Sequence, residues 1–371
     1  MKRVEYHSYS SQKAAEKLKS LQLVLPSLCT DFFRSVSQTT SALTRQAYAY
    51  DLRLFFGYLT QEEADFSDTE PRLMTADHMK KITSRHIEGF QEYLQFYVRQ
   101  KYVPGKNQEE ETSVTIQNHE LGIMRKLSAI RSFFDYLFRN QVIPANIAAL
   151  IAMPKKQSKP ILYMETDEIA RMISAVNEGS GFGEKQQRYI SRTKTRDLAI
   201  LMMFLGTGIR VSELVGLDMD HINFENNSFL VTRKGGSQTI LYFPDTVSKL
   251  LKDYVMERKS LPTLPGHEQA LFLSLQKRRL TQRAVEKLVK KYALLGAPLK
   301  KKLSPHKLRS TFGTNLYQAT GDIYLVADTL GHADVNTTRK HYAAMSDAKR
   351  REAAKKIPLP DVKPQKNQGS S

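Results

Sequence analysis

The residues best suited to chemistry are two arginines, two histidines and one tyrosine, most of them in the last third of the chain. They are Arg210, His306, Arg309, His332 and Tyr342. A tyrosine hydroxyl supplies an oxygen nucleophile, guanidinium groups hold the non-bridging oxygens of a phosphate in bidentate fashion, and imidazoles transfer protons. This combination of residue types is suited to attack on a phosphodiester.

The charge balance favours a phosphate-rich partner. The 371 residues contain 56 Lys and Arg against 38 Asp and Glu, which gives a formal net charge of +18. Nucleic acid is the first candidate. An anionic membrane surface is a weaker candidate, because no lysine-rich amphipathic helix with a large apolar face is evident.

Two further features of the sequence bear on the cellular compartment and on the kinds of site that the protein can contain. The sequence shows neither an apolar leader nor an apolar run of membrane-spanning length, so we expect a soluble, cytoplasmic protein. Its single cysteine, Cys29, excludes an internal disulfide and a cysteine-based zinc site.

Two helices with apolar stripes are predicted in the first part of the chain. The stripes are Tyr48, Leu52, Phe55, Phe56 and Leu59 in one helix and Ile123, Leu127, Ile130, Phe134 and Leu137 in the other. Their spacing is typical of helices that face a core. Basic residues beside the stripes could reach a phosphate backbone, but we expect any single one to be solvated; they are Arg45, Arg53, Arg125, Lys126 and Arg131. Residues 102–116 are predicted to be an exposed, acidic loop, because they contain Pro104, Gly105 and a run of glutamates.

The sequence divides at residues 153–160, a predicted linker with two prolines and three lysines but no apolar periodicity. A helix is predicted to begin at Thr166, whose hydroxyl can cap it, so the second domain begins near residue 161. The predicted divisions are an N-terminal extension at 1–24, a helical domain at 25–152, a linker at 153–162, a second domain at 163–357 and a disordered tail at 358–371.

Arg210 is predicted to lie in a turn between two apolar helices. The first helix covers residues 197–205 and ends at a Gly-Thr-Gly sequence, and Ser212 is placed to cap the second. A charged residue held there needs a carboxylate partner or an anionic ligand. Glu213 can supply the carboxylate, so this motif by itself allows both interpretations.

Residues 229–243 alternate like two short strands joined by a Gly-Gly turn, which places Lys234 at or beside the tip. An ammonium group at this position suits a donor that reaches into a DNA groove toward a leaving oxygen. Most lysines at hairpin tips are only solvated, so the position alone does not decide between the two interpretations.

A helix predicted to begin at Ser304 and Pro305 carries His306 and Arg309 on one face. This spacing lets an imidazole and a guanidinium converge on one phosphate near the helix N-terminus. The same pair is also compatible with an ordinary capped helix that has two exposed polar residues.

A further apolar helix is predicted at residues 323–330, where Gly331 stops it and leaves His332 just past its end. Tyr342 follows in a short helix that Asn336 can cap. A tyrosine in such a helix usually packs against its neighbours, but Tyr342 is set apart by its place after the Gly-His pair.

Together these motifs resemble the tyrosine recombinase and integrase family, and within it the Xer-like site-specific recombinases. The family signature is an arginine in a Gly-x-Arg-x-Ser-Glu turn, a His-x-x-Arg, a Gly-His and a nearby tyrosine. The residues on family positions are Arg210, Lys234, His306, Arg309, His332 and Tyr342. The hairpin reads Arg-Lys-Gly-Gly-Ser-Gln in place of the commoner Gly-Lys-Gly-x-Lys, so Arg233 is an alternative to Lys234. His341, next to the tyrosine, leaves the register of the nucleophile open.

The resemblance implies a mainly α fold with a small β-sheet, arranged as a two-domain C-shaped clamp. Residues 25–152 would form a helical, SAM-like core-binding domain on DNA, and residues 163–357 a mixed α/β catalytic domain of the tyrosine recombinase type. No cofactor and no metal ion are implied.

The implied mechanism begins with attack of Tyr342 on a DNA phosphate, which forms a 3′-phosphotyrosyl bond and frees a 5′-hydroxyl. Arg210 and Arg309 would stabilise the pentacoordinate phosphorane, and Lys234 would protonate the departing oxygen. His306 and His332 would orient groups and exchange protons. The 5′-hydroxyl of a partner duplex then reverses the step, so ATP is not needed.

The resemblance also implies a homotetramer on two double-stranded DNA duplexes with specific recombination sites, and an accessory DNA translocase or directionality factor is a further candidate partner. Residues 277–302 contain ten Lys and Arg against one acid, Glu286, and are expected to contact the DNA backbone from one side of an amphipathic helix. A last helix, at residues 346–356, is expected to dock on a neighbouring protomer through Ile357 and Leu359.

Two other functions are compatible with these residues. A type IB topoisomerase-like enzyme would use the same groups without a partner strand and would relax plasmids that lack a specific site. A DNA-binding protein without catalysis would explain the charge and the helices but not the co-occurrence of all six groups.

Among recombinases, chromosome dimer resolution, mobile-element integration or excision, and inversion share one active site. Residues 1–25 are too short for a folded arm-binding domain, which favours the simple two-domain type.

Overall fold

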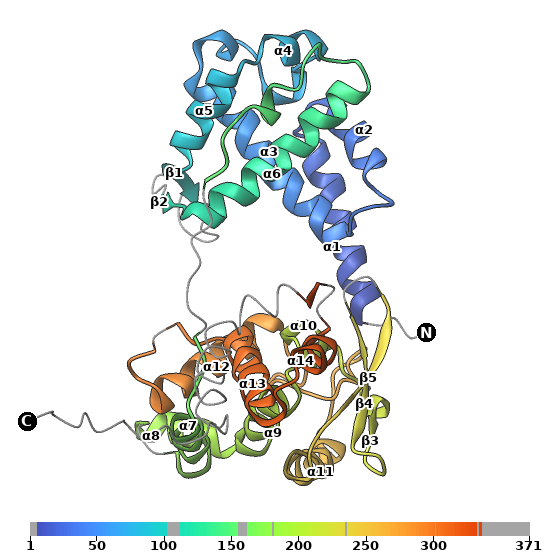
Figure 1. Cartoon of the computed structure of the whole chain (residues 1–371), viewed down its shortest axis with the longest axis vertical. Helices are drawn as coiled ribbons and strands as arrows, with labels where there is room; N and C mark the ends of the chain where they lie inside the picture. The colour runs from blue at the N-terminus through green and yellow to red at the C-terminus, as the bar shows by residue number, and fades with distance from the viewer. Residues whose placement is uncertain are drawn as a thin grey trace, which may run out of the picture. The chain divides into compact units, whose positions relative to one another are not determined.

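The computed structural model describes residues 6–101, 112–154, 162–179, 182–233, 236–300, 302–331 and 334–335. The chain is mainly helical with small sheets and separates into two compact units, Met1–Ser158 and Lys159–Ser371 (Figure 1). Among the helices in these ranges, none is both long enough and apolar enough to cross a membrane.

The first unit is a bundle of helices around an aromatic core. Its elements are α1 (Tyr6–Gln22), α2 (Ser27–Ser35), α3 (Ala42–Glu62), α4 (Ala76–Lys81), α5 (Ser84–Tyr93), α6 (Glu120–Arg139), β1 (Phe96–Lys101) and β2 (Thr112–Gln117), with short 3₁₀ turns between them. Both predicted apolar stripes are confirmed, because every stripe residue on α3 and α6 is buried except Tyr48, which packs partly buried against the same core. Phe55 packs edge-on against Phe90 with ring centroids 5.1 Å apart, and Phe32 packs likewise on Phe133 at 5.4 Å.

The β1–β2 hairpin corrects the prediction of a loop at 102–116. Residues 112–116 belong to β2, which pairs antiparallel with β1 so that Tyr97 lies opposite Ile116. Both side chains pack on the core of the unit. The glycine, proline and glutamates on which the loop prediction rested lie within residues 102–111, which are outside the described residues. The β-branched residues that follow them favour a strand and belong to β2.

The second unit is built around the apolar helix α9. Its helices are α7 (Thr166–Glu178), α8 (Glu184–Ser191), α9 (Lys194–Thr207), α10 (Val211–Gly216), α11 (Asp245–Ser260), α12 (Gln282–Gly296), α13 (Pro305–Thr320) and α14 (Ile323–Leu330). Helix α9 packs against α7, α11 and α13, and its Ile200, Leu201 and Phe204 are fully buried. The described residues therefore place α13, which carries His306 and Arg309, directly on the core helix that precedes Arg210.

Helix α7 begins at the predicted residue, Thr166, but the cap is different. Glu165 is the N-cap residue, and its backbone N–H donates to Glu168 Oε2 at 2.8 Å. Thr166 is therefore the first residue of the helix, and the prediction that its hydroxyl caps the helix is wrong.

The three-stranded antiparallel sheet of the second unit has the order β3 (Ile222–Asn223), β4 (Ser228–Thr232) and β5 (Gln238–Tyr242). Phe229 and Leu241 lie opposite each other and are buried, as is Val231. The two strands predicted at 229–243 are confirmed. Lys234 and Gly235, which come between the two strands in the sequence, lie outside the described residues.

Candidate active site

Arg210 is the N-cap residue of α10 and is held by the carboxylate of Glu213. Helix α9 ends where Gly208 adopts a left-handed conformation, with φ of 61°, and the chain turns into α10. The backbone N–H of Arg210 donates to Glu213 Oε2 at 2.9 Å and its Nη1 donates to Oε1 at 2.8 Å. Glu213 is buried, whereas the Arg210 side chain is 32% exposed. The carboxylate therefore orients the guanidinium from its buried side and leaves part of it accessible to a ligand.

This arrangement decides two points about the α9–α10 turn. Glu213 is the carboxylate partner of Arg210, as the sequence allowed. Ser212 lies inside the first turn of α10 and Arg210 occupies the cap position, so the prediction that Ser212 caps this helix is wrong.

Arg309 connects the ends of two helices from its place on α13. Its Nη1 donates to the carbonyl oxygen of Gly208, and its Nη2 donates to the carbonyl oxygen of Leu330. The side chain is 5% exposed. His306 lies one turn earlier on the same helix and is exposed. Pro305 begins α13 and Ser304 is its N-cap residue, as predicted, but the Ser304 side chain makes no capping hydrogen bond. His306 and Arg309 both lie near this N-terminal end of the helix.

The C-terminal end of α14 brings together three arginines from three elements. Arg233 Nη2 donates to the carbonyl oxygen of Thr329 at 3.2 Å, Arg309 to that of Leu330, and Arg210 Nη2 to that of Gly331 at 2.9 Å. The last carbonyls of a helix lack partners within the helix and carry partial negative charge, so they hold cationic side chains well.

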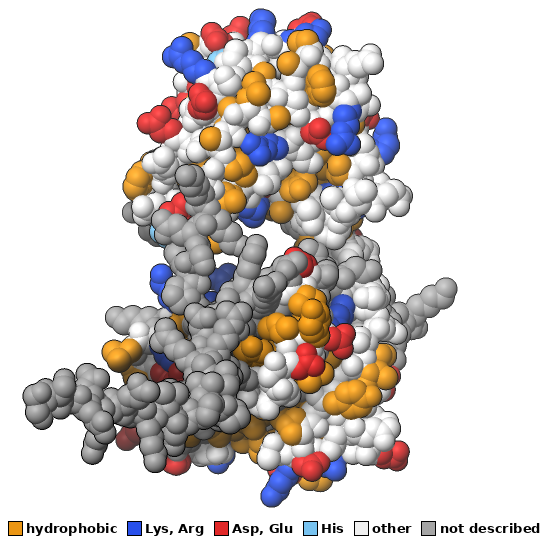
Figure 2. All heavy atoms as spheres, viewed as in Figure 1, with side chains coloured by type: hydrophobic (Ala, Val, Ile, Leu, Met, Phe, Trp, Pro, Cys, Tyr) orange, Lys and Arg blue, Asp and Glu red, His pale blue; other side chains and the backbone are white. Residues whose placement is uncertain are grey.

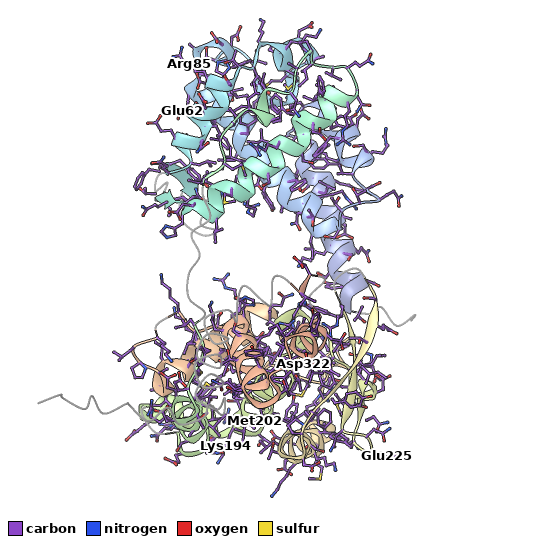
Figure 3. The ribbon with its side chains drawn as sticks, viewed as in Figure 1. Glu62, Arg85, Lys194, Met202, Glu225 and Asp322 are labelled. Carbon is purple, nitrogen blue, oxygen red and sulfur yellow. The ribbon has the colours of Figure 1, made fainter. Side chains whose placement is uncertain are left out.

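At its other end, α14 begins after Asp322, which is labelled in Figure 3. Asp322 caps the helix, because its Oδ1 accepts from the backbone N–H groups of Tyr324 and Leu325 at 2.8 and 3.1 Å. Gly331 ends the helix as predicted, with φ of 58°. The short helix is thus fixed at its start by an aspartate and at its end by arginines, which defines where the chain leaves toward His332.

Arg233 was predicted only as an alternative to Lys234, and its contacts could not be read from the sequence. Burial lowers the pKa of its guanidinium; Glu213 opposes this change and Arg210 adds to it. Its Nη1 is buried and has no hydrogen-bond partner among the described residues. The charges of both members of the Arg210–Glu213 pair therefore act on Arg233.

Of the six predicted site residues, Arg210, His306 and Arg309 lie within the described residues. Arg210 and Arg309 meet at the end of α14, and His306 shares a helix with Arg309. Lys234, His332 and Tyr342 lie outside the described residues. Two of these residues directly follow described residues at the end of α14 or in contact with it: Lys234 follows Arg233, and His332 follows Gly331, whose carbonyl oxygen accepts from Arg210.

Four of the five basic residues predicted beside the stripes make hydrogen bonds within the first unit, which corrects the expectation that each is only solvated, whereas Arg53 is exposed as expected. Arg125 makes two hydrogen bonds to the buried Asp51, and Lys126 Nζ donates to Asn118 Oδ1 at 2.7 Å. Arg131 donates to backbone carbonyls at residues 148–151, and Arg45 to those of residues 37 and 40. On the visible face of this unit, the remaining basic side chains are scattered among acidic and apolar ones (Figure 2).

The basic segment at 277–302 divides into structural and exposed residues. Helix α12 buries Val285, Leu288, Val289 and Tyr292 along one side, as predicted. Arg279 donates to the carbonyl oxygens of Val215 and Leu217 and to Asp218, and Lys300 Nζ donates to Glu168 at 2.6 Å. Lys291 Nζ lies 4.3 Å from the ring centroid of Tyr292. The exposed basic residues are Lys277, Arg278, Arg283, Lys287, Lys290 and Lys302.

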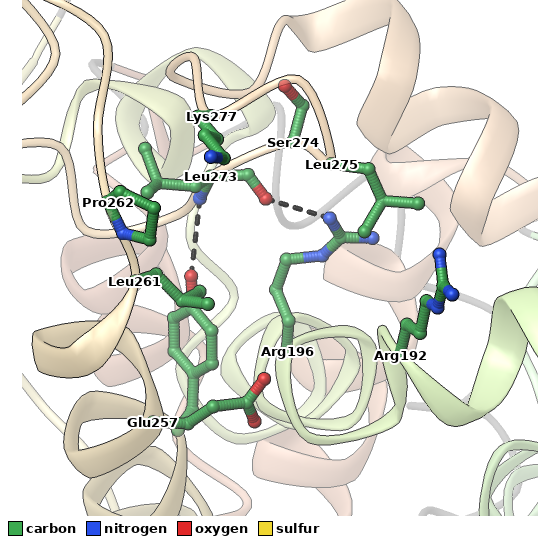
Figure 4. Close-up of a pocket in the computed structure, with 10 residues that line it drawn as sticks. Arg192, Arg196, Glu257, Leu261, Pro262, Leu273, Ser274, Leu275 and Lys277 are labelled. Carbon is green, nitrogen blue, oxygen red and sulfur yellow. Dashed lines mark hydrogen bonds between the residues drawn. The ribbon is translucent and has the colours of Figure 1, made fainter.

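A small pocket between α9, α11 and the turn at 273–277 contains none of the predicted site residues (Figure 4). Arg196 reaches its wall, where Nη1 donates to the carbonyl oxygen of Leu273 at 2.7 Å while Nε and Nη2 bind Asp197. Tyr254 Oη accepts from the backbone N–H of Leu273 at 3.2 Å. The buried polar groups of this pocket are thus occupied by one another.

One group of potential metal ligands occurs among the described residues, formed by Asp218, Asp220 and His221. Asp218 pairs with Arg279, and the backbone N–H of Asp218 donates to His221 Nδ1 at 3.2 Å. These bonds account for the arrangement without an ion.

Comparison with known proteins gives the family. The model of the phage integrase family matches residues 163–349, which include the arginine cluster. The chain belongs to this family. It is a tyrosine-type site-specific recombinase of the Xer-like kind, as the sequence predicted.

The similarity extends beyond the matched segment. The chain is 30% identical to the tyrosine recombinase XerC of Caldanaerobacter subterraneus subsp. tengcongensis over 344 residues, which cover 91% of this chain and 88% of that protein. It is 27% identical to the tyrosine recombinase XerS of Streptococcus uberis over 90% of this chain and 96% of that protein. These alignments span both units.

Solved recombinase structures share the fold. XerH bound to its difH substrate in a pre-cleavage complex matches with a TM-score of 0.57 at 21% identity, over 86% of this chain and 81% of that chain. A λ integrase dimer bound to a COC′ core site matches with a TM-score of 0.54 at 14% identity, over 84% and 96%. The predicted fold class, mainly α with small sheets in two domains, is confirmed.

Proposed function

We propose that this recombinase cleaves one DNA strand by attack of Tyr342 Oη on a phosphate, forming a 3′-phosphotyrosyl bond and releasing a 5′-hydroxyl. The observation that supports this proposal most strongly is the fixed placement of Arg210 and Arg309. Both guanidiniums are hydrogen-bonded to successive carbonyls at the end of α14. Two cations held this way can stabilise the charge of a pentacoordinate phosphorane without reorganising during the reaction.

The remaining groups have distinct proposed roles. His306 and His332 exchange and orient protons near the phosphate, and Lys234 protonates the 5′-oxygen as the phosphorus–oxygen bond breaks. The phosphotyrosyl ester conserves the energy of the broken bond. Attack by the 5′-hydroxyl of a partner strand therefore rejoins DNA and frees Tyr342.

The two units have separate proposed tasks on the DNA. Residues 25–152 form the core-binding domain and residues 163–357 the catalytic domain, joined by a linker at 153–162. Exposed basic residues on and beside α12, such as Arg283 and Lys287, contact the phosphate backbone. Four protomers on two duplexes form the working assembly, and residues 346–359 dock on the neighbouring protomer.

The biological role that we propose is resolution of chromosome dimers in the cytoplasm. The support is the similarity over most of the chain to proteins named XerC and XerS. Deleting the gene should then produce cells with unpartitioned chromosomes. Normal partition, together with loss of excision of a mobile element, would instead assign the chain to integration and excision.

A plasmid assay separates site-specific recombination from the alternatives. A supercoiled plasmid with two directly repeated candidate sites should be resolved into two circles, while the same plasmid without sites should keep its supercoils. Relaxation of the site-free plasmid would identify a topoisomerase-like activity. Tight binding with neither product would support a DNA-binding protein without catalysis.

A further inference from the structure

Arg233 joins the β4–β5 hairpin to the end of α14. Its backbone N–H donates to the carbonyl oxygen of Ser237 at 2.8 Å, and its own carbonyl oxygen accepts from the N–H of Gly236 at 3.0 Å, so Arg233 closes the hairpin. Its side chain leaves the hairpin and donates to the carbonyl oxygen of Thr329 at 3.2 Å. A single residue thus holds the turn end of the hairpin against another element.

The guanidinium of Arg233 occupies the space that a side chain at Gly331 would need. A Cβ built on Gly331 would overlap Nη1 of Arg233, and Gly331 has a φ of 58°. Glycine is therefore required there for the helix end and for the approach of Arg233. The contact lies between the residue directly before Lys234 and the residue directly before His332.

This placement of Arg233 costs stability. Its Nη1 is buried without a hydrogen-bond partner among the described residues, and burial lowers the pKa of the guanidinium. A buried donor without a partner destabilises a fold. Unfavourable arrangements of this kind are concentrated at functional sites, so the burial of Arg233 indicates that its position serves the reaction.

We propose that Arg233 is a positioning residue for DNA cleavage, which clamps the hairpin on Gly331 and so places the Lys234 ammonium at the departing 5′-oxygen. The inference rests on the proposed role of Lys234 as proton donor. Tyr342 Oη bonds to phosphorus and gives its proton to one of the two histidines, while the bond between phosphorus and the 5′-oxygen breaks and Lys234 gives its proton to that oxygen. Arg233 transfers no proton and acts only through the hairpin.

A change of leaving group tests this role directly. In a 5′-bridging phosphorothiolate, the departing atom is sulfur, and a thiolate is a weak enough base to leave without protonation. Loss of a proton donor, or of its placement, should therefore be rescued by this substrate. Loss of phosphate binding should not be rescued, because the phosphate charge is the same.

The experiment measures single-turnover cleavage of nicked duplexes with oxygen or sulfur at the scissile 5′ position. Arg233→Met should cleave the oxygen substrate about 100-fold more slowly than the wild type, which is the usual contribution of a proton donor, and should cleave the sulfur substrate within about 10-fold of it. Lys234→Ala should show the same rescue, and Arg210→Met should show none. Arg233→Lys, which keeps the charge but not the forked geometry, should be intermediate on oxygen and also be rescued.

Arg258→Met is the matched control for a purely structural loss. Arg258 is also a buried arginine that donates to two backbone carbonyls, those of Ala270 and Glu268, but it lies on α11 away from the cluster. It should lower the melting temperature and change cleavage of both substrates equally. If Arg233→Met behaves like Arg258→Met, or loses activity on both substrates, the positioning role is wrong.

A second pair of variants tests the contact itself. Gly331→Ala should slow cleavage of the oxygen substrate and be rescued by sulfur, and its effect should shrink in an Arg233→Met background because the overlapping guanidinium is gone. Gly179→Ala is the control, since Gly179 ends α7 with φ of 66° and has only Gln187 near a built Cβ. Additive effects of Gly331→Ala and Arg233→Met would contradict the proposal. If Lys234→Ala itself is not rescued by sulfur, the proposed role of Lys234 fails, and the inference fails with it.

Discussion

Arg210 donates through Nη2 to the carbonyl oxygen of Gly331 at 2.9 Å, across 121 residues of sequence. The same guanidinium donates through Nη1 to Glu213 Oε1 at 2.8 Å. One arginine therefore connects the turn after α9 to the residue that precedes His332. Arg210, which we propose to bind the phosphate, is thus hydrogen-bonded to Gly331, the residue directly before the proposed catalytic residue His332.

The Arg210–Glu213 pair allows stability and catalysis to be separated. Arg210→Met leaves Glu213 as a buried carboxylate without its cation and should lower the free energy of unfolding by about 3 kcal/mol. Adding Glu213→Gln removes the buried charge while keeping an oxygen that accepts from the backbone N–H of residue 210, so most of the lost stability should return. Urea unfolding measures this recovery. Cleavage should stay at least about 100-fold below wild type in both variants, and a double variant that cleaves normally would remove Arg210 from the phosphate site.

The basic segment around α12 should show two kinds of arginine. Arg283 is exposed, whereas Arg279 donates to two backbone carbonyls and to Asp218. Arg283→Ala should weaken DNA binding and reduce the slope of log affinity against log salt concentration by about 1, the value for one lost phosphate contact. Arg279→Met should instead lower the melting temperature and leave that slope unchanged. Fluorescence anisotropy at several salt concentrations measures the slopes, and equal changes for the two variants would refute this division.

Much of the fold followed from local sequence patterns. The stripes of α3 and α6 repeat within single helices, and Gly331 ends α14 where an apolar run meets a glycine. The partners of basic side chains depend on tertiary neighbours instead. Arg125 reaches Asp51 across 74 residues of sequence, so no local pattern distinguishes it from an arginine that binds DNA. Arg233 was missed as a member of the α14 cluster for the same reason, because Thr329 lies 96 residues away from it.

Tyr254 should make the second unit sensitive to alkali. It is 1% exposed, and its hydroxyl donates to the carbonyl oxygen of Leu271 at 3.0 Å. Burial raises the pKa of Tyr254 to about 12. A raised pKa in the folded state means that the protonated hydroxyl contributes stability in full below pH of about 10, the unfolded value, and loses it as pH rises toward 12.

A phenylalanine variant isolates this contribution. From pH 9 to 12 the wild type should lose about 2 kcal/mol more unfolding free energy than Tyr254→Phe, because the other titrating groups are common to both proteins. Chemical unfolding of the full chain at each pH gives the difference. If the unfolding free energies of the two proteins fall equally with pH, the pKa of Tyr254 does not differ between the folded and unfolded states, which would contradict this prediction.

Covalent trapping tests the central claim, that Tyr342 is the nucleophile of a DNA strand transfer. Wild type, Tyr342→Phe and His341→Ala are incubated with nicked suicide duplexes carrying candidate sites, and denaturing gels are read for a protein–DNA adduct. We expect an adduct with the wild type and with His341→Ala and none with Tyr342→Phe, and the junction sequence then gives the recombination site. An adduct that persists in Tyr342→Phe, or tight binding of a cognate duplex by all three proteins without any adduct, would contradict this claim.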